Sequence, residues 1–237
     1  MASSRRRAPP SSSVPADLLP VQRAPTASFR LARLVGIPLL NLLFRIRTEG
    51  RERIPRQGAY VVIANHLGWL DSFLILSAFP SEPRIHFLGN PSGLSARRLQ
   101  WWTVRQVGGF IPVDRARQGN QQLFEHVDRC LERGGAVALY PEGEYGRQEG
   151  RLLPFRKGFA HFAIDHKVPI VPVGLSGTHE LWLRKSVLLR IGDPIATRGQ
   201  TVEGLLPLAR ARVQALLHEL PPEPGPHLLA DRLTRLF

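Results

Sequence analysis

The sequence has 237 residues, of which 43% are hydrophobic, and a formal net charge of +13 from 32 basic and 19 acidic side chains. This apolar content is enough for a folded core, so it excludes a wholly disordered chain. The single cysteine, Cys130, excludes a disulfide within the chain and a zinc site built from cysteines.

The first 28 residues are rich in serine, proline and arginine and have little apolar surface to bury. We therefore expect a disordered basic tail over residues 1–28. An arginine- and serine-rich start that is poor in acids is also typical of an organelle transit peptide, which is a second interpretation. A secretory signal is not expected, because no apolar core follows the arginines at 5–7.

Residues 29–47 have an apolar middle with a pair of arginines on each side. This pattern predicts an amphipathic helix that lies in the interface of an anionic membrane, with its arginines at the depth of the lipid headgroups. Packing of the same helix on the core of the domain is the alternative. The longest uncharged apolar run, residues 34–44, is too short to span a bilayer.

From residue 48 onward, short apolar runs alternate with segments of helical periodicity. This alternation predicts a single α/β domain over 48–220, with a mainly parallel central sheet flanked by helices. The predicted strands are 59–64, 84–89, 110–114, 136–141, 169–175 and 187–192. The predicted helices are 71–79, 121–134, 157–167 and 202–220, the last of them bent at Pro207.

A C-terminal extension is expected over residues 221–237. It begins with a proline-rich stretch at 221–226, which ends the preceding domain. Its last eleven residues combine leucines with arginines and predict a short basic amphipathic helix.

The segment NHLGWLD, residues 65–71, follows the strand predicted at 59–64. On a regular helix, His66 and Asp71 would point about 140° apart. They meet only if His66 lies in the turn after the strand and Asp71 begins the next helix, and Gly68 makes such a turn easy. A histidine whose other ring nitrogen bonds a carboxylate is a general base suited to a substrate hydroxyl. The alternative is that Asp71 only caps the helix.

Polar residues also follow two later strands. Arg115 comes directly after one of them, and Glu142 and Gly143 follow another. Because the carboxyl ends of parallel strands meet at one edge, we expect these residues near the His–Asp pair. Arg156 and Lys157 precede a helix, whose first N–H groups also favour anions. Cations beside a base suggest a phosphorylated alcohol as the substrate.

Four ordered segments resemble the conserved blocks of the glycerolipid acyltransferase family, which includes the 1-acylglycerol-3-phosphate O-acyltransferases. The family's blocks read N-H-x-x-x-x-D, G-x-I-x-x-x-R, F-P-E-G-T-R and V-P-I-V-P-V. This chain has NHLGWLD, GFIPVDR, YPEGEYGR and VPIVPV, in the same order. The resemblance covers approximately residues 48–195.

The resemblance implies that His66 and Asp71 are catalytic. It also implies that the second and third blocks bind the acyl acceptor and that the fourth block, at 168–173, lies on the acyl-chain side. The predicted substrate-binding residues are Asn65, Arg115, Glu142, Gly143, Arg147, Arg156 and Lys157.

One position departs from the family pattern. Where the third block of the family has Thr-Arg, this chain has Glu144 and Tyr145, so an acid and a phenol replace an expected cation. Arg147 or the basic pair at 156–157 would have to supply the missing charge. Without such a charge, the acceptor would not be a phosphate monoester.

The resemblance thus implies a membrane-associated O-acyltransferase that moves a fatty acyl group from acyl-CoA or an acyl-carrier protein to a lysolipid hydroxyl. Lysophosphatidate is the first expected acceptor, and another lysolipid or alcohol is the alternative. We expect no cofactor and no metal, an anionic membrane surface as partner, and a location on the cytoplasmic face of the membrane.

Two other classes of function compete with this interpretation. The altered third block would also suit a membrane-binding homologue without activity. Nucleic-acid binding is suggested by the sequence pI of about 11.3, but the sequence contains no recognisable nucleic-acid-binding module, so no nucleic-acid partner is expected.

Overall fold

The structure is a computed structural model, and it describes residues 24–89, 109–112, 121–218, 220–223 and 227–236. Most of the tail predicted over residues 1–28 lies outside these ranges. Arg115, in the second family block, lies outside them as well.

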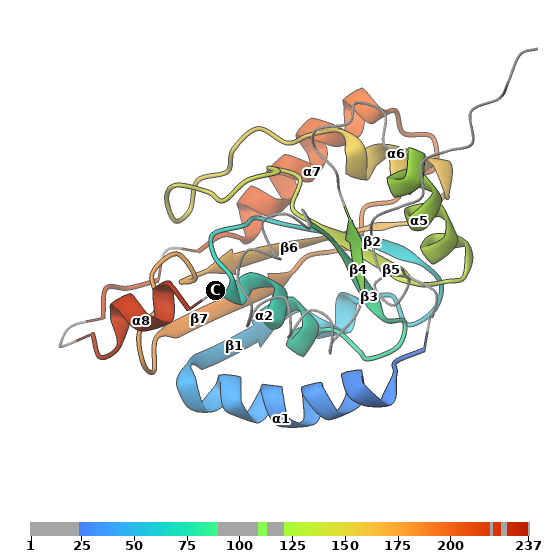
Figure 1. Cartoon of the computed structure of the whole chain (residues 1–237). Helices are drawn as coiled ribbons and strands as arrows, with labels where there is room; N and C mark the ends of the chain where they lie inside the picture. The colour runs from blue at the N-terminus through green and yellow to red at the C-terminus, as the bar shows by residue number, and fades with distance from the viewer. Residues whose placement is uncertain (1–23, 90–108, 113–120, 219, 224–226, 237) are drawn as a thin grey trace, which may run out of the picture.

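A seven-stranded sheet forms the centre of the molecule, in the order β1-β7-β6-β2-β5-β3-β4 (Figure 1). Every neighbouring pair is parallel except β6 with β7, which confirms the predicted, mainly parallel sheet. The strands are β1 (Arg45–Glu49), β2 (Tyr60–Ala64), β3 (Ile85–Gly89), β4 (Phe110–Pro112), β5 (Ala136–Leu139), β6 (Ile170–Ser176) and β7 (Ser186–Ile191).

Helices cover both faces of this sheet. Figure 1 shows α1 and α2 on one side and α5, α6 and α7 on the other. The helices are α1 (Ala27–Leu43), α2 (Leu70–Ala78), α5 (Gln121–Glu132), α6 (Gly158–Asp165), α7 (Val202–Leu216) and α8 (Ala230–Thr234), with a short 3₁₀ helix, η2 (Arg51–Arg53). Strand β2 is fully buried: Val62 faces one core and Val61 the other. This two-sided burial explains why β2 is a continuous apolar run.

The helix predicted over residues 29–47 is too long, because α1 ends at Leu43 and the next residues form strand β1. Phe44, which caps α1, is fully buried and extended. In the strand that follows, Arg45 and Arg47 are exposed and pair with β7 on the edge of the sheet. The folded domain therefore begins before residue 48, and these two arginines belong to the sheet rather than to the helix.

One side of α1 is docked on the domain through Phe29, whose side chain is buried. The guanidinium carbons of Arg33 and Arg84 lie 5.8 and 4.8 Å from the centre of its ring. Arg33 also donates hydrogen bonds to the carbonyls of Leu76 and Phe79 at the C-terminal end of α2. The alternative of packing on the domain is therefore confirmed for this side of the helix.

The other side of α1 carries a row of exposed apolar side chains. Its members are Leu31, Leu34, Val35, Leu39 and Leu42. None of the helices in the described ranges has the length and apolar character needed to cross a bilayer.

The predicted C-terminal extension is packed against the domain through α8. Leu233 is buried in the same core as α2, and its carbonyl accepts a hydrogen bond of 2.8 Å from the indole nitrogen of Trp69. Thr234 exchanges hydrogen bonds with the backbone of Leu181. The short helix expected near the end of the sequence is confirmed at residues 230–234.

Close packing of α7 on β6 makes Gly174 a sensitive position. A Cβ atom added there would lie 2.6 Å from Cβ of Leu216 and 2.8 Å from its backbone carbonyl carbon. Because backbone cannot move aside cheaply, we expect Gly174→Ala to lower the free energy of unfolding by about 1–3 kcal/mol. Equilibrium unfolding in urea measures this change.

Gly36→Ala is the matched control, because nothing lies within 4 Å of a Cβ atom added at Gly36 in α1. It should stabilise the protein by about 0.5–1 kcal/mol, the helix-propensity difference between the two residues. Equal stability of the two variants would contradict the inferred packing.

Candidate active site

The candidate site lies at the carboxyl ends of β2 and β5. Ile63 pairs with Leu139, so His66 and Glu142, each three residues further along, lie at the same level of the sheet. The chain leaves β2 into α2 on one face of the sheet, and it leaves β5 toward α6 on the opposite face (Figure 1). Where the connections of neighbouring strands run on opposite faces of an open α/β sheet, a crevice forms at the carboxyl edge, and ligands bind there.

His66 and Asp71 meet as predicted. Nδ1 of His66 lies 2.8 Å from Oδ2 of Asp71, which is completely buried. The same carboxylate oxygen accepts the backbone N–H groups of Leu67 at 2.6 Å and Gly68 at 2.9 Å. The carboxylate therefore organises the whole turn between β2 and α2.

The turn also explains the glycine at position 68. A Cβ atom added to Gly68 would lie 2.8 Å from the backbone carbonyl oxygen of Thr178. Any larger residue would therefore push the turn away from the loop between β6 and β7, and His66 would move with it.

The hydrogen bond to Asp71 decides which ring nitrogen of His66 carries the proton. A carboxylate only accepts, so Nδ1 carries the proton and Nε2 keeps its lone pair. Within the described part of the chain, no group is hydrogen-bonded to Nε2, and 18% of the side chain remains exposed. This ring nitrogen is chemically able to accept a proton.

Glu142 holds the His66 turn from the neighbouring strand. Its buried carboxylate accepts the backbone N–H of His66 at 3.1 Å through Oε1 and that of Leu153 at 2.7 Å through Oε2. Gly146 N donates to the carbonyl of His66 at 2.6 Å. Burial raises the pKa of Glu142, and the two amide donors partly offset this rise. Glu142 is thus a positioning residue in the structure, and its contact with an acceptor stays a prediction.

Asn65 is likewise engaged inside the fold. Its buried amide donates to the carbonyl of Leu175 at 2.9 Å and accepts the N–H of the same residue at 2.8 Å. The side chain thereby continues the pairing of β2 with β6 beyond the end of the strand. Its surroundings give no support to the prediction that it contacts the acceptor.

Among the predicted cations, the structure brings Arg156 to the third block. Gly143 has φ +76°, and a Cβ atom on it would lie 2.6 Å from Nε of Arg156. Glycine is therefore needed here both for its backbone conformation and for the close approach of the guanidinium. All three of these basic residues are exposed at the surface: Arg147, Arg156 and Lys157. Arg115 cannot be placed, because it lies outside the described residues.

Of the fourth block, residues 168–173, the last four form the beginning of β6 and are buried in the core. Its expected association with the acyl chain stays a prediction. In the part of the chain that the structure describes, no three His, Cys, Asp or Glu side chains are arranged to hold a metal ion.

Two tyrosines beside His66 were not assigned a role from the sequence. The ring of Tyr140 is stacked on the imidazole with 3.7 Å between centroids and 4° between planes. The ring of Tyr145 lies 4.2 Å from the imidazole centroid, tilted by 42°. The signal for Tyr140 was available, because it occupies the aromatic first position of the third block. For Tyr145, the sequence indicates only that a tyrosine replaces the arginine of the family pattern.

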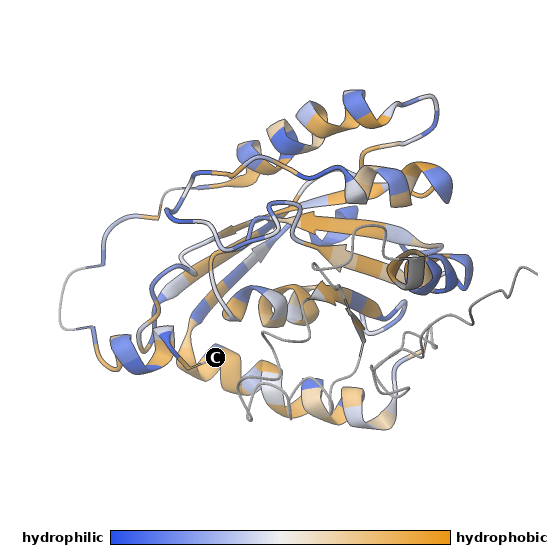
Figure 2. Cartoon of the chain, turned by 45° about the horizontal axis from the view of Figure 1, so that its top comes forward, coloured by the Kyte–Doolittle hydropathy of each residue, from blue (hydrophilic) through white to orange (hydrophobic). Residues whose placement is uncertain are grey.

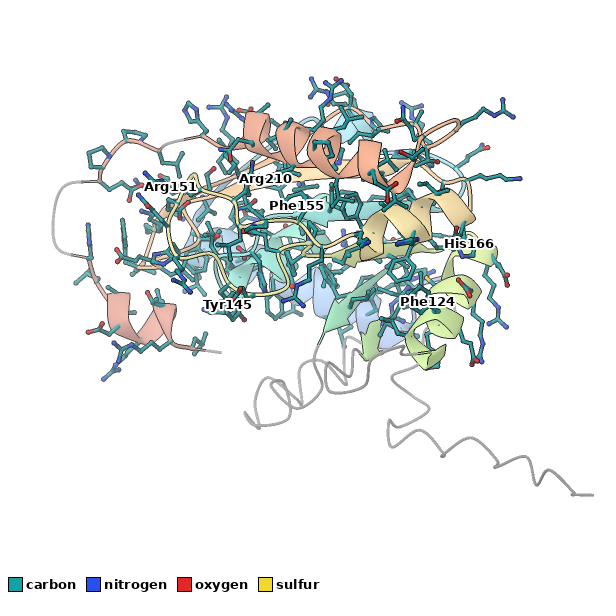
Figure 3. All side chains as sticks on the ribbon, turned by 90° about the horizontal axis from the view of Figure 1, so that it is seen from above. Phe124, Tyr145, Arg151, Phe155, His166 and Arg210 are labelled. Atoms are coloured by element: carbon teal, nitrogen blue, oxygen red, sulfur yellow. The ribbon has the colours of Figure 1, made fainter. Side chains whose placement is uncertain are left out.

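The loop that carries these residues is fixed to its surroundings (Figure 3). Arg210 of α7 donates to the carbonyl of Leu152 at 3.1 Å, and Gln214 donates to that of Gly150 at 2.8 Å. Figure 3 shows Arg210 and Arg151 close together where α7 passes this loop. Hydrogen bonds from α7 therefore hold the loop that follows the third block.

Comparison with known proteins identifies a matching family and a solved structure of similar fold. The protein family described as Acyltransferase matches residues 45–176, which is more than half of the chain. The solved structure of the 1-acyl-sn-glycerophosphate (LPA) acyltransferase from Thermotoga maritima is similar in fold. It has a TM-score of 0.63 and 23% sequence identity, and the match covers 79% of this chain and 77% of that one.

Curated relatives are also similar in sequence. A 1-acyl-sn-glycerol-3-phosphate acyltransferase of Limnanthes douglasii is 29% identical over 163 residues, which are 66% of this chain and 52% of the relative. The alpha form from Homo sapiens is 26% identical over 194 residues, which are 75% of this chain and 65% of the relative. The chain thus spans about half the length of the plant relative.

The raised pKa of Glu142 generates a test of its buried position. The folded protein binds this proton more tightly than the unfolded chain, in which the pKa is near 4.5. The contribution of Glu142 to the free energy of unfolding should therefore fall as the pH rises from about 4.5 through the higher pKa of the folded state. Glu142→Gln cannot lose a proton and should lack this fall.

Urea unfolding between about pH 4 and about pH 7 measures the effect. Glu144→Gln is the matched control, because Glu144 lies exposed in the same loop, and this variant should keep the wild-type pH dependence. A wild-type pH dependence in Glu142→Gln would show that the carboxylate is not buried as described.

Proposed function

The chain belongs to the Acyltransferase family, and we propose that it transfers a fatty acyl group from a thioester to the hydroxyl of a lysolipid. The donor would be acyl-CoA or an acyl-carrier protein, and lysophosphatidate is the first candidate acceptor. The observation that carries this proposal is the His66–Asp71 pair, whose geometry leaves Nε2 of His66 as an accessible base.

The proposed reaction follows from this geometry. Nε2 of His66 takes the proton of the acceptor hydroxyl, and the oxygen attacks the carbonyl carbon of the thioester. The C–O bond forms, the C–S bond breaks, and the departing thiolate receives the proton from the imidazolium. Asp71 stabilises the imidazolium and holds the ring in the required tautomer. The products are an ester and a free thiol.

Two observations support a phosphate on the acceptor. Arg156 lies against Gly143 at the carboxyl end of β5, where a cation would face the crevice. Relatives from a plant and a mammal are named 1-acyl-sn-glycerol-3-phosphate acyltransferases. The replacement of the family arginine by Tyr145 supports the second candidate, which is a lysolipid without a phosphate monoester.

We further propose that the exposed row of α1 rests on an anionic membrane surface, on its cytoplasmic face. Leu34 and Leu42 are 73% and 66% exposed, an unusual degree of exposure for leucines on one side of a helix. Figure 2 shows hydrophobic colour along much of α1. The helix contains arginines and no acidic residue, which favours anionic lipid.

The first test is an acyl-transfer assay with labelled oleoyl-CoA or palmitoyl-CoA and His66→Ala. Because general-base catalysis supplies about 100- to 10,000-fold, we expect the variant to lose at least ~100-fold in turnover. His161→Ala is the matched control, since His161 is an exposed histidine on α6 and should not affect turnover. Full activity of His66→Ala would reject the mechanism.

The same assay decides the acceptor. The panel contains lysophosphatidate, glycerol 3-phosphate, other lysophospholipids and lyso-aminolipids. Transfer to lysophosphatidate that is lost in His66→Ala supports the first candidate, whereas transfer only to an acceptor without a phosphate monoester supports the second. An acyl-carrier-protein donor is tested in parallel. Inactivity with every donor and acceptor would leave the non-catalytic homologue as the better interpretation.

Membrane binding is tested by sedimentation with vesicles of anionic lipid. Deleting residues 29–47 would remove β1, so we choose Leu34→Ser with Leu42→Ser. Burial of one leucine contributes about 1.5–3 kcal/mol, so the double variant should bind at least about tenfold more weakly. Added salt should weaken wild-type binding. Phe124→Ser, at an exposed aromatic residue on α5, is the control. Unchanged sedimentation of the double variant would contradict the proposal.

A further inference from the structure

His66 is enclosed by aromatic rings on both of its faces. Tyr140 covers one face at 3.7 Å in a nearly parallel stack. The centroid of Tyr145 is only 4.2 Å from that of the imidazole, which is too short for a contact with the ring edge. The first face is already occupied, so Tyr145 covers the opposite one.

We propose that Tyr140 and Tyr145 form an aromatic clamp that stabilises the imidazolium of His66 and restricts the acceptor to the edge of the ring that carries Nε2. Both are positioning residues, and their role in the reaction rests on the proposed acyl transfer.

Tyr140 is the fixed half of the clamp. Its hydroxyl is hydrogen-bonded to Oγ of Ser72 at 2.8 Å, and its ring stacks on Phe87 with centroids 6.2 Å apart. Burial and the nearby charge of Asp71 raise the pKa of Tyr140 well above the ordinary value. The phenol therefore stays neutral near pH 7 and offers His66 an uncharged aromatic face.

Tyr145 is the exposed half of the clamp. Its side chain is 53% exposed, so it contributes little to the core. The next residue, Gly146, donates its N–H to the carbonyl of His66, and a Cβ atom on Gly146 would lie 3.3 Å from that oxygen. The backbone beside Tyr145 is thus attached to the backbone of His66, which keeps the phenol over the imidazole.

The clamp matters when His66 becomes charged. The faces of aromatic rings attract cations, so both phenols stabilise the imidazolium more than the neutral imidazole. Within the described residues, the carboxylates of Asp71 on α2 and Glu142 after β5 also act on this ring. With both faces covered, a hydroxyl reaches Nε2 only in the plane of the ring, which is the direction of its lone pair.

A titration of His66 tests the clamp without requiring any activity. The Cε1–H signal of His66 is followed by NMR against pH in the wild type, Tyr145→Phe and Tyr145→Leu. Leucine fills space but lacks a π face, so we expect Tyr145→Leu to bind the proton about two- to fivefold more weakly. Tyr145→Phe keeps the ring and should titrate like the wild type. A midpoint in Tyr145→Leu equal to that in Tyr145→Phe would overturn the proposal.

Kinetics provide the second measurement. With the acceptor found active, kcat/KM of Tyr145→Leu should fall about two- to fivefold near neutral pH, and Tyr145→Phe should restore most of it. Equal losses in both variants would show that the hydroxyl, not the aromatic face, matters, and would overturn the clamp. If no acceptor is active while the two titrations still differ, the acyl-transfer function fails and the clamp stands.

Discussion

The geometry of the site depends on one buried carboxylate oxygen. Oδ2 of Asp71 accepts three N–H groups, from Leu67, Gly68 and the ring of His66, and its side chain has no exposure to solvent. A carboxylate removed from water is costly unless donors replace its hydration. Here the donors to Oδ2 are two backbone groups of the turn and the imidazole ring of His66. The hydrogen bonding of this oxygen and the placement of the imidazole are therefore one structural requirement.

The sheet brings the first and third family blocks together. Strands β2 and β5 are neighbours in the sheet, although α2, β3, β4 and α5 lie between them along the chain. Glu142 connects these turns, because its two oxygens accept one N–H from each side of the site, at His66 and Leu153. The third block thus acts as a support for the first. Asn65 likewise connects the first block to β6, because its side chain is hydrogen-bonded to the backbone of Leu175.

Much of this arrangement could be predicted from the sequence, because strands buried on two faces and amphipathic helices leave clear local periods. The strand β1 could not, since its alternation of arginine with Ile46 and Thr48 directly continues the apolar run of α1. Its partner β7 is far away in the sequence. The His66–Asp71 contact followed from a five-residue spacing. The role of Glu142 and the stacking of Tyr145 depend on a loop-to-loop contact that no local pattern records.

The hydrogen bond from Trp69 to the carbonyl of Leu233 has a consequence for the order in which the molecule is completed. Trp69 belongs to the turn that carries His66, whereas Leu233 is synthesised more than 160 residues later. Likewise, β1 obtains its neighbour only when β7 has been made. During synthesis the central strands and their helices are thus available well before this support for the turn that carries His66. The turn that carries His66 therefore obtains this hydrogen bond only after α8 has been made.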